Sequence, residues 1–243
     1  SWIESEFMAQ EFSESIDEPH YWAYGGYLNL VRDGGEEPLS THADHYVTNR
    51  AYGTAAYSKG EVLLNQLGAI IGEETRNQGV RSYFDQWAFK HPGPIDFKRV
   101  MERESGLELD TYFQYMLNST HHVDVAIRSV VVTEESTSIT LERIGKLPLP
   151  VDVRITDANG NVSDHHIPQV VTQGHRPLHE GETGHKAWPW TNPTYVLTLP
   201  HSLPGCTVEV DASKLTADID RNNNRVELAS GTIQEWRSEA PKR

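Results

Sequence analysis

Two tyrosines five residues apart are the side chains of this sequence best suited to chemistry. Tyr52 and Tyr57 lie in the stretch 52–60, which leads directly into a long amphipathic segment. Five residues correspond to about 500° of α-helix, so the two side chains would not share a face of one continuous helix. If Thr54 caps the helix, both hydroxyls converge near its N-terminus, where developing negative charge is favoured. The alternative is a pair of ordinary tyrosines whose hydroxyls are satisfied by neighbouring groups.

The histidines give weaker patterns. His42 and His45 are three residues apart without a glutamate between them, unlike a zinc-binding HExxH helix. The adjacent pairs 121–122 and 165–166 point apart on a strand or a helix, so they are poor chelates. A Gly-rich loop holds a loose cluster of residue types that bind metals: His175, His179, Glu180, Glu182 and His185. The alternative is a set of solvated loop residues, and we expect no metal or cofactor site in this chain.

Composition narrows the classes of partner. The formal net charge of −14 over 243 residues argues against nucleic acid and anionic membranes. No apolar run approaches the roughly 18–20 residues that cross a bilayer. The single cysteine, Cys206, cannot form an internal disulfide, so cysteine content does not indicate whether the protein resides in an oxidising or a reducing compartment. The chain begins with Ser1 and lacks a signal-like segment, so we expect a mature form or an internal piece of a longer protein.

Hydrophobic periodicity changes once along the chain. In the first part, apolar residues recur with helical spacing. Glycine and proline residues end the predicted helices and leave short connections between them, except for a long loop that precedes residue 52. The predicted helices are 1–16, 21–32, 54–71, 74–89, 96–105 and 109–117. After residue 122 the period becomes that of strands, with a strong hairpin turn at 157–161. The predicted strands are 123–127, 130–132, 138–143, 151–156, 162–167, 195–199 and 207–210.

These elements predict an α+β fold, in which a helical lobe is followed by an antiparallel β-sandwich. We expect the helical lobe at residues 1–120 and the β-sandwich at 121–220. Residues 221–243 are polar and are expected to form a C-terminal tail.

Three parts of the sequence resemble the C-terminal portion of the aminopeptidase-N-like zinc metallopeptidases, a gluzincin family. The stretch 52–60 is similar to the family's Tyr-x4-Tyr-x-Lys-Gly motif. The run 83–92, with 96–97 and 105–109, resembles the helices that follow the motif. The segment 188–195 with 208–211 resembles the β module of bacterial members, so the resemblance covers most of the chain.

The resemblance implies a function and a site. It implies that residues 1–120 are the helical lobe of a thermolysin-like catalytic domain. In this family zinc-activated water attacks a peptide carbonyl. By position, Tyr57 would stabilise the resulting oxyanion and Tyr52 would support it. Zinc is therefore the cofactor of the intact family member, and a peptide is its substrate.

The sequence departs from the family at the metal ligands. The HExxH helix and the exopeptidase-specificity motif that precedes it do not occur in residues 1–243. The family's third ligand is a glutamate, and the nearest match, 2–7, places Ser5 there. Glu4 and Glu6 flank that position, but a shift of one residue turns a helical side chain by about 100°.

Our leading hypothesis is a C-terminal metallopeptidase fragment that is not active alone and that lacks the N-terminal part of its catalytic domain. A helical face left exposed in this way would favour a homodimer. A degenerate, non-catalytic relative that acts as a binding or interaction module is the alternative. A metal-binding β module that uses the loop 175–185 is a third option. The sequence thus leaves open whether the chain is an enzyme.

Overall fold

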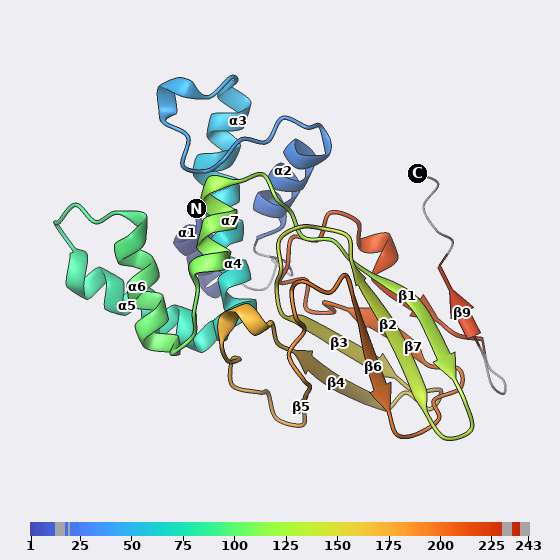
Figure 1. Ribbon diagram of the computed structural model, residues 1–243. Helices are drawn as coiled ribbons and strands as arrows, with labels where there is room; N and C mark the ends of the chain where they lie inside the picture. The colour runs from blue at the N-terminus through green and yellow to red at the C-terminus, as the bar shows by residue number, and fades with distance from the viewer. Residues whose placement is uncertain (13–17, 19, 230–234, 239–243) are drawn as a thin grey trace. The chain divides into compact units, whose positions relative to one another are not determined.

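The computed structural model describes residues 1–12, 18, 20–229 and 235–238. The chain divides into two compact units. The first comprises residues 1–122, 172–177 and 215–219, and the second comprises the rest. The first is helical and the second is built from β-sheets, so the α+β fold class is confirmed (Figure 1).

Seven α-helices and one π-helical segment form the described part of the helical unit. They are α1 (Trp2–Glu11), α2 (Tyr21–Arg32), α3 (Asn49–Gly53), the π-segment η3 (Thr54–Lys59), α4 (Gly60–Ile71), α5 (Glu73–Trp87), α6 (Pro94–Ser105) and α7 (Asp110–Asn118). A short 3₁₀ turn, η2 (Ala43–His45), interrupts the loop after α2. The predicted helix 1–16 ends earlier, at Glu11, and its residues 13–16 lie outside the described part of the chain.

Helix α4 forms the centre of this unit. Almost every residue from Glu61 to Ile71 is buried, including the apolar residues Val62 and Leu67. Tyr112 of α7 donates a hydrogen bond to the carbonyl of Leu63 at 2.7 Å. The helix ends at Ile71, as predicted, and Gly72 follows it with φ of 88° and ψ of 142°; this positive φ favours glycine, but the residue is not in the αL conformation expected for such a stop. Because α4 is buried on nearly all sides, its position fixes the direction of the π-segment that precedes it.

Gly79 allows α5 and α6 to approach closely. A Cβ atom at this position would lie 2.4 Å from Sδ of Met101, which is fully buried. Gly79→Ala should therefore destabilise the chain by about 1 kcal/mol, because overpacking costs about 1–3 kcal/mol. That cost exceeds the gain of about 1 kcal/mol in helix propensity. Urea unfolding measures the change.

Gly25 of α2 supplies the matched control, since nothing lies within 4 Å of a Cβ built there. Gly25→Ala should be stabilising by about 0.5–1 kcal/mol through propensity alone. Equal effects of the two substitutions would contradict this explanation of the α5–α6 contact.

Two short segments from the later part of the chain pack with the helices. The amide of Glu108 donates to the carbonyl of Thr172 at 3.0 Å. The buried side chain of Gln66 accepts from the amide of Ala217 at 2.7 Å. Residues 172–177 and 215–219 therefore lie in the helical unit and not in the predicted β-sandwich domain.

The described residues of the β unit form two sheets. One has the strand order β6-β2-β1-β9 and the other β5-β4-β3-β7-β8. The strands are β1 (Val125–Val132), β2 (Thr137–Arg143), β3 (Val151–Thr156), β4 (Val162–Ile167), β5 (Thr183–Gly184), β6 (Thr194–Leu199), β7 (Thr207–Val210), β8 (Arg225–Glu227) and β9 (Glu235–Arg237). Short 3₁₀ turns lie at η4 (Val170–Thr172) and η5 (Arg221–Asn223). All pairs are antiparallel except β4–β5, which is parallel.

Two predictions for this unit need correction. The predicted strands 123–127 and 130–132 are one strand, β1, with an irregularity between Ile127 and Ser129. The prediction of a polar tail at 221–243 is wrong in part, because β8 pairs with β7 and β9 pairs with β1. Both strands are only three residues long, too short for an alternating pattern to be recognised in the sequence.

None of the helices in the described ranges is both long enough and apolar enough to cross a bilayer.

Candidate functional site

The helix that carries Tyr52 and Tyr57 begins earlier than predicted. Thr48 is its N-cap, and the Thr48 hydroxyl accepts a hydrogen bond from the amide of Ala51 at 3.0 Å. From Asn49 the chain continues through α3, η3 and α4 to Ile71. Thr54 therefore lies inside the helix and is not its N-cap. Because the helix dipole acts within the first turn, Tyr57 does not benefit from it, contrary to the prediction.

The π-segment changes how the two tyrosines are related. In a π-helix the hydrogen bonds join residues five apart, so each turn holds more residues and two side chains five positions apart are separated by a smaller angle than in an α-helix. Residues 52 and 57 have this spacing, and Tyr57 lies within the π-segment Thr54–Lys59. The widened turn thus brings Tyr57 back toward the side of Tyr52, whereas a regular α-helix would separate them by about 140°. Single π-turns inside α-helices occur frequently at functional sites.

Both tyrosines are accessible. The exposed fraction is 65% for Tyr57 and 44% for Tyr52. The ring of Tyr52 packs against that of Tyr46, with 5.6 Å between the ring centroids. Among the residues that the structure describes, neither hydroxyl has a hydrogen-bond partner. The hydroxyl of Tyr57 can therefore donate to a bound molecule without first breaking a bond within the protein.

A buried ion pair holds the π-segment from the inside. Nζ of Lys59 lies 2.6 Å from Oε1 of Glu36 and donates to the carbonyl of Ser119 at 3.1 Å. Burial, and then the charge and hydrogen bond of Glu36, raise the pKa of the Tyr27 hydroxyl far above its ordinary value. Glu36 thus accepts a hydrogen bond from Lys59 and lies near the Tyr27 hydroxyl. The pair connects the π-segment to the long loop that follows α2 and to the end of α7.

The close approach of α2 also positions the π-segment. A Cβ atom at Gly26 would lie 2.9 Å from Oγ of Ser58. Glycine at this position therefore lets α2 lie against the turn that carries Tyr57.

A second polar network lies at the position expected for the third metal ligand. Oγ of Ser5 donates to Oε1 of Glu61 at 2.7 Å. The ring of His20 lies between two carboxylates, with Nδ1 2.8 Å from Oε1 of Glu61 and Nε2 3.1 Å from Oε1 of Glu6. An ionised carboxylate can only accept, so this arrangement requires a proton on each ring nitrogen or one on a carboxyl group. Glu61 is the residue after the tyrosine motif, and the network joins the motif to α1.

Arg76 attaches α1 to the same region. The guanidinium group is buried and lies 4.6 Å from the ring centroid of Trp2. Burial lowers the pKa of Arg76, and the nearby Glu73 and Glu6 oppose that shift. Helix α1 is therefore held by a cation–π contact and a polar network, while Ile3 and Phe7 on its other side are exposed.

The residues beside the tyrosines do not fit the family's zinc site. A hydroxyl of Ser5 stands at the ligand position, and it is already engaged with Glu61. Among the described residues, two groups of three side chains have ligand atoms close enough together to bind one metal ion. They are Asp152-His166-Glu182 and Glu102-Glu108-Asp110. Neither group includes a residue of the tyrosine motif or of α1. We therefore derive no metal-dependent catalytic step for this site from residues 1–243.

Some of the candidate histidines form pairs in the structure, and only His166 among them belongs to a group of three with metal-ligand spacing in the described residues. The rings of His42 and His45 lie 5.3 Å apart on an exposed turn. His165 and His166 point to different partners, as predicted for adjacent residues on a strand. Nδ1 of His165 lies 3.0 Å from Nε2 of His185, and burial and the charge of His185 lower the pKa of His165. From the predicted cluster at 175–185, Glu182 alone joins a group with metal-ligand spacing in the described residues.

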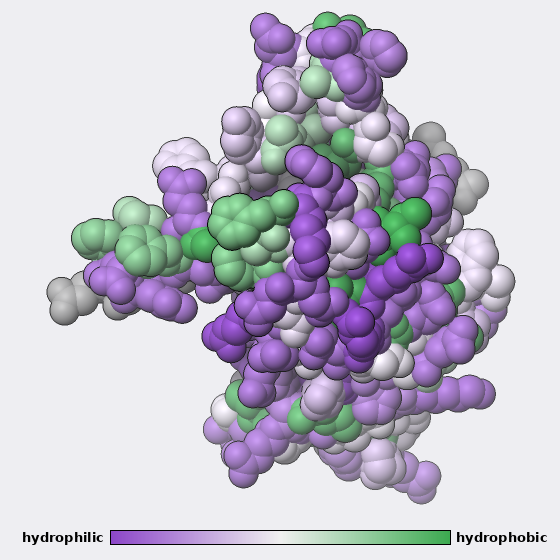
Figure 2. Space-filling model, turned by 90° about the vertical axis from the view of Figure 1, so that its left-hand side faces the viewer, coloured by the Kyte–Doolittle hydropathy of each residue, from purple (hydrophilic) through white to green (hydrophobic). Residues whose placement is uncertain are grey.

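Exposed apolar side chains also occur away from the tyrosines. Figure 2 shows one face of the molecule, on which hydrophobic atoms gather mainly at the left of the view and hydrophilic atoms cover most of the rest. Phe84, Phe89 and Ile95 of α5, α6 and the link between them are all exposed.

Comparison with known proteins gives the family. Residues 2–116 match the model of the peptidase family M1 domain. The match covers slightly less than half of the chain, and it confirms the resemblance of the helical part to aminopeptidase-N-like metallopeptidases. No curated protein matches the chain.

Solved structures support the same fold. The crystal structure of Legionella pneumophila aminopeptidase A in complex with aspartic acid matches with a TM-score of 0.52 and 12% identity. The match covers 80% of this chain and 21% of that chain, so the present sequence spans about a fifth of the other protein's length. At this identity the likeness shows the fold alone.

Proposed function

We propose that this chain is the C-terminal part of an aminopeptidase-like metallopeptidase, in which Tyr57 stabilises the oxyanion formed during hydrolysis of a peptide bond. The observation that carries the proposal is the accessible hydroxyl of Tyr57 on a π-turn whose inner side is fixed by the buried Lys59–Glu36 pair. A donor that is already in place when charge develops stabilises the transition state without reorganisation. Tyr52 would support this donor from the preceding turn of the helix.

The metal of such an enzyme would be bound by residues outside the sequence 1–243. Ser5 supports this inference, because its hydroxyl is used within the protein. The exposed apolar side chains of α1, Ile3 and Phe7, offer a surface for the remaining part of a catalytic domain or for a second copy. Residues 1–243 alone should therefore be inactive.

The test is an aminopeptidase assay of residues 1–243 with fluorogenic aminoacyl amides and added Zn²⁺. We expect no turnover above the rate in buffer. The same residues joined to a segment that carries HExxH, and that also supplies the third ligand in place of Ser5, should hydrolyse the substrates. Turnover by residues 1–243 alone would contradict the proposal, and so would an inactive joined polypeptide that binds zinc and is folded.

A non-catalytic relative that acts as a binding module is the second candidate. The network of Ser5, Glu61 and His20 favours it, because these groups satisfy one another where the family places a metal ligand. The reading frame upstream of residue 1 discriminates between the two candidates. An HExxH motif about 20 residues before residue 5 supports the enzyme, and a complete frame without it supports the binding module.

A further inference from the structure

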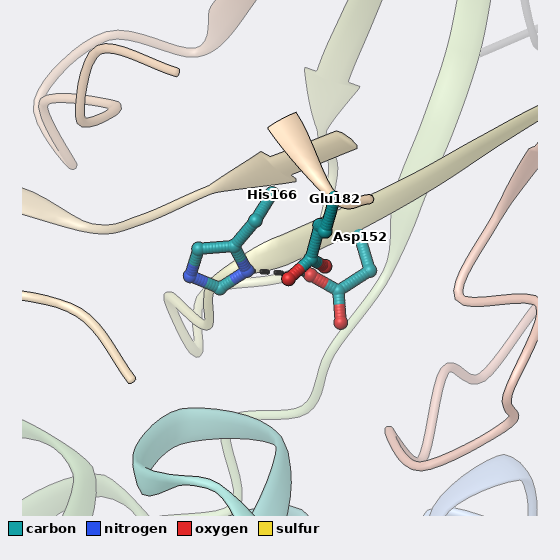
Figure 3. Close-up of side chains that lie close together, drawn as sticks. All are labelled: Asp152, His166 and Glu182. Atoms are coloured by element: carbon teal, nitrogen blue, oxygen red, sulfur yellow. Dashed lines mark hydrogen bonds and ion pairs between the residues drawn. The ribbon is translucent and has the colours of Figure 1, made fainter. Parts of the chain in front are cut away.

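Three side chains of the β unit form a compact group that the tyrosine site does not use. Asp152, His166 and Glu182 each present one ligand atom, and these atoms all lie within 4.8 Å of one another. Figure 3 shows both carboxylates on the same side of the His166 ring, with the hydrogen bond between the ring and Asp152 marked. Nδ1 of His166 lies 2.6 Å from Oδ1 of Asp152.

The sheet register places two of the three groups. Asp152 of β3 and His166 of β4 are directly opposed in an antiparallel pair. Side chains of opposed residues lie on the same face of a sheet, close enough to interact. Val151 and Val153 alternate with Asp152 and are buried, so the hydrophobic core lies on the other face of β3. Asp152 and His166 are thus a fixed polar pair outside the apolar layer between the sheets.

A tight turn brings the third group to the pair. The amide of Glu182 donates to the carbonyl of His179 at 3.0 Å, and Gly181 has φ of 77°, as such a turn requires. One carboxylate oxygen of Glu182 accepts from the amide of His179 at 2.9 Å. Strand β5 then pairs with β4, placing Gly184 beside His166. The backbone therefore directs Glu182 toward the Asp152–His166 pair.

The charges of the group favour a cation. Two carboxylates lie against one imidazole, and His166 has no exposed surface while Asp152 is about one-third exposed. Like charges held close together are destabilised unless a positive charge lies between them. An imidazole nitrogen with two carboxylate oxygens is a ligand set that Zn²⁺ and related divalent transition metals accept.

We propose that Asp152, His166 and Glu182 bind a divalent transition-metal ion, with Zn²⁺ as the probe. The ion takes the place of the proton between His166 and Asp152 and links the turn 179–184 to strands β3 and β4. Three protein ligands leave a further position for water. The site is independent of Tyr57 and of the proposed peptidase function.

The other group with metal-ligand spacing does not support a similar proposal. Glu102, Glu108 and Asp110 are all acidic, and Lys98 lies near both Glu102 and Asp110. Glu102 also accepts from the amide of Leu109 at 3.1 Å. A cation from the protein therefore already balances this group.

The experiment is a titration of the metal-free chain with ZnCl₂ by calorimetry, after dialysis against a chelator. We expect one saturable Zn²⁺ per chain and a rise in the melting temperature on binding. Glu182→Gln and Asp152→Asn should each weaken binding by more than about 10-fold. Both residues are partly exposed, so these variants are better suited to the test than substitutions of the buried His166.

Glu180→Gln is the matched control, since Glu180 lies on the same turn and the variant removes the same charge. It should bind Zn²⁺ as the parent chain does. The proposal is overturned if the parent chain shows no saturable binding. It is also overturned if Glu182→Gln binds unchanged, or if Glu180→Gln loses as much affinity as Glu182→Gln.

Discussion

Lys59→Met is expected to lower the free energy of unfolding of the helical unit by about 3–5 kcal/mol. The side chains of Lys59 and Glu36 are 2% and 5% exposed, and their charged atoms lie 2.6 Å apart. Removing the ammonium group leaves the carboxylate buried beside Tyr27 without a compensating charge. Water cannot replace the lost partner in a site of this burial, so the desolvation cost is not recovered. A loss of this size is a large share of the roughly 5–15 kcal/mol that stabilises a typical domain.

Urea unfolding, followed by the helical circular dichroism signal, measures the loss. The double variant Lys59→Met with Glu36→Gln should recover more than half of it, because both charges are then absent and Tyr27 keeps an acceptor. Arg50→Met is the control, since Arg50 and Asp33 form an ion pair in which both side chains are more than half exposed. That variant should cost at most about 1 kcal/mol. An Arg50→Met effect as large as that of Lys59→Met would show that burial is not the cause.

The sequence is sufficient to predict most of the helices and most of the strands. The apolar positions of α4 recur with helical spacing, and burial of almost the whole helix explains why that signal was strong. Helix α3 was missed because its five residues, Asn49–Gly53, include no apolar stripe. The π-segment was missed for another reason. A π-turn contains one extra residue, and here packing against α2 stabilises it. Sequence-based helix propensity is a local property and contains no information about such packing.

The contacts near the tyrosines depend on residues far apart in the chain. Lys59 meets Glu36 across 23 positions, and Ser5 meets Glu61 across 56. A lysine after a tyrosine motif gives no indication that it is buried, because most lysines are exposed. The structural role of Lys59 therefore could not be deduced from the motif.

Part of the proposed metal-binding group of the β unit, Asp152-His166-Glu182, can be predicted from the sequence. A five-residue turn at 157–161 pairs residue 156 with 162, and therefore 152 with 166, as the structure has it. The predicted hairpin thus contained the information that Asp152 faces His166. Glu182 could not be added in the same way, because β5 has two residues and its parallel pairing is non-local.

Tyr57→Phe is expected to reduce kcat by about 10²–10³-fold in the polypeptide that joins residues 1–243 to an HExxH segment, if the proposed function holds. The substitution keeps the ring and removes the hydroxyl that would donate to the oxyanion. Because that bond strengthens only as charge develops, KM should change little. Steady-state kinetics with a fluorogenic aminoacyl amide separate the two parameters. Tyr52→Phe should give a smaller loss, because that residue is proposed to support Tyr57.

Tyr21→Phe is the matched control for these variants. Tyr21 is 59% exposed, close to the 65% of Tyr57, and lies at the start of α2. It should leave kcat and KM unchanged, since loss of an exposed hydroxyl has no general effect on the fold. A Tyr57→Phe enzyme with full kcat would remove Tyr57 from the catalytic role while leaving the M1 fold intact. In that case the π-turn would be a packing feature, fixed by Lys59 inside and by the close approach of Ser58 to Gly26.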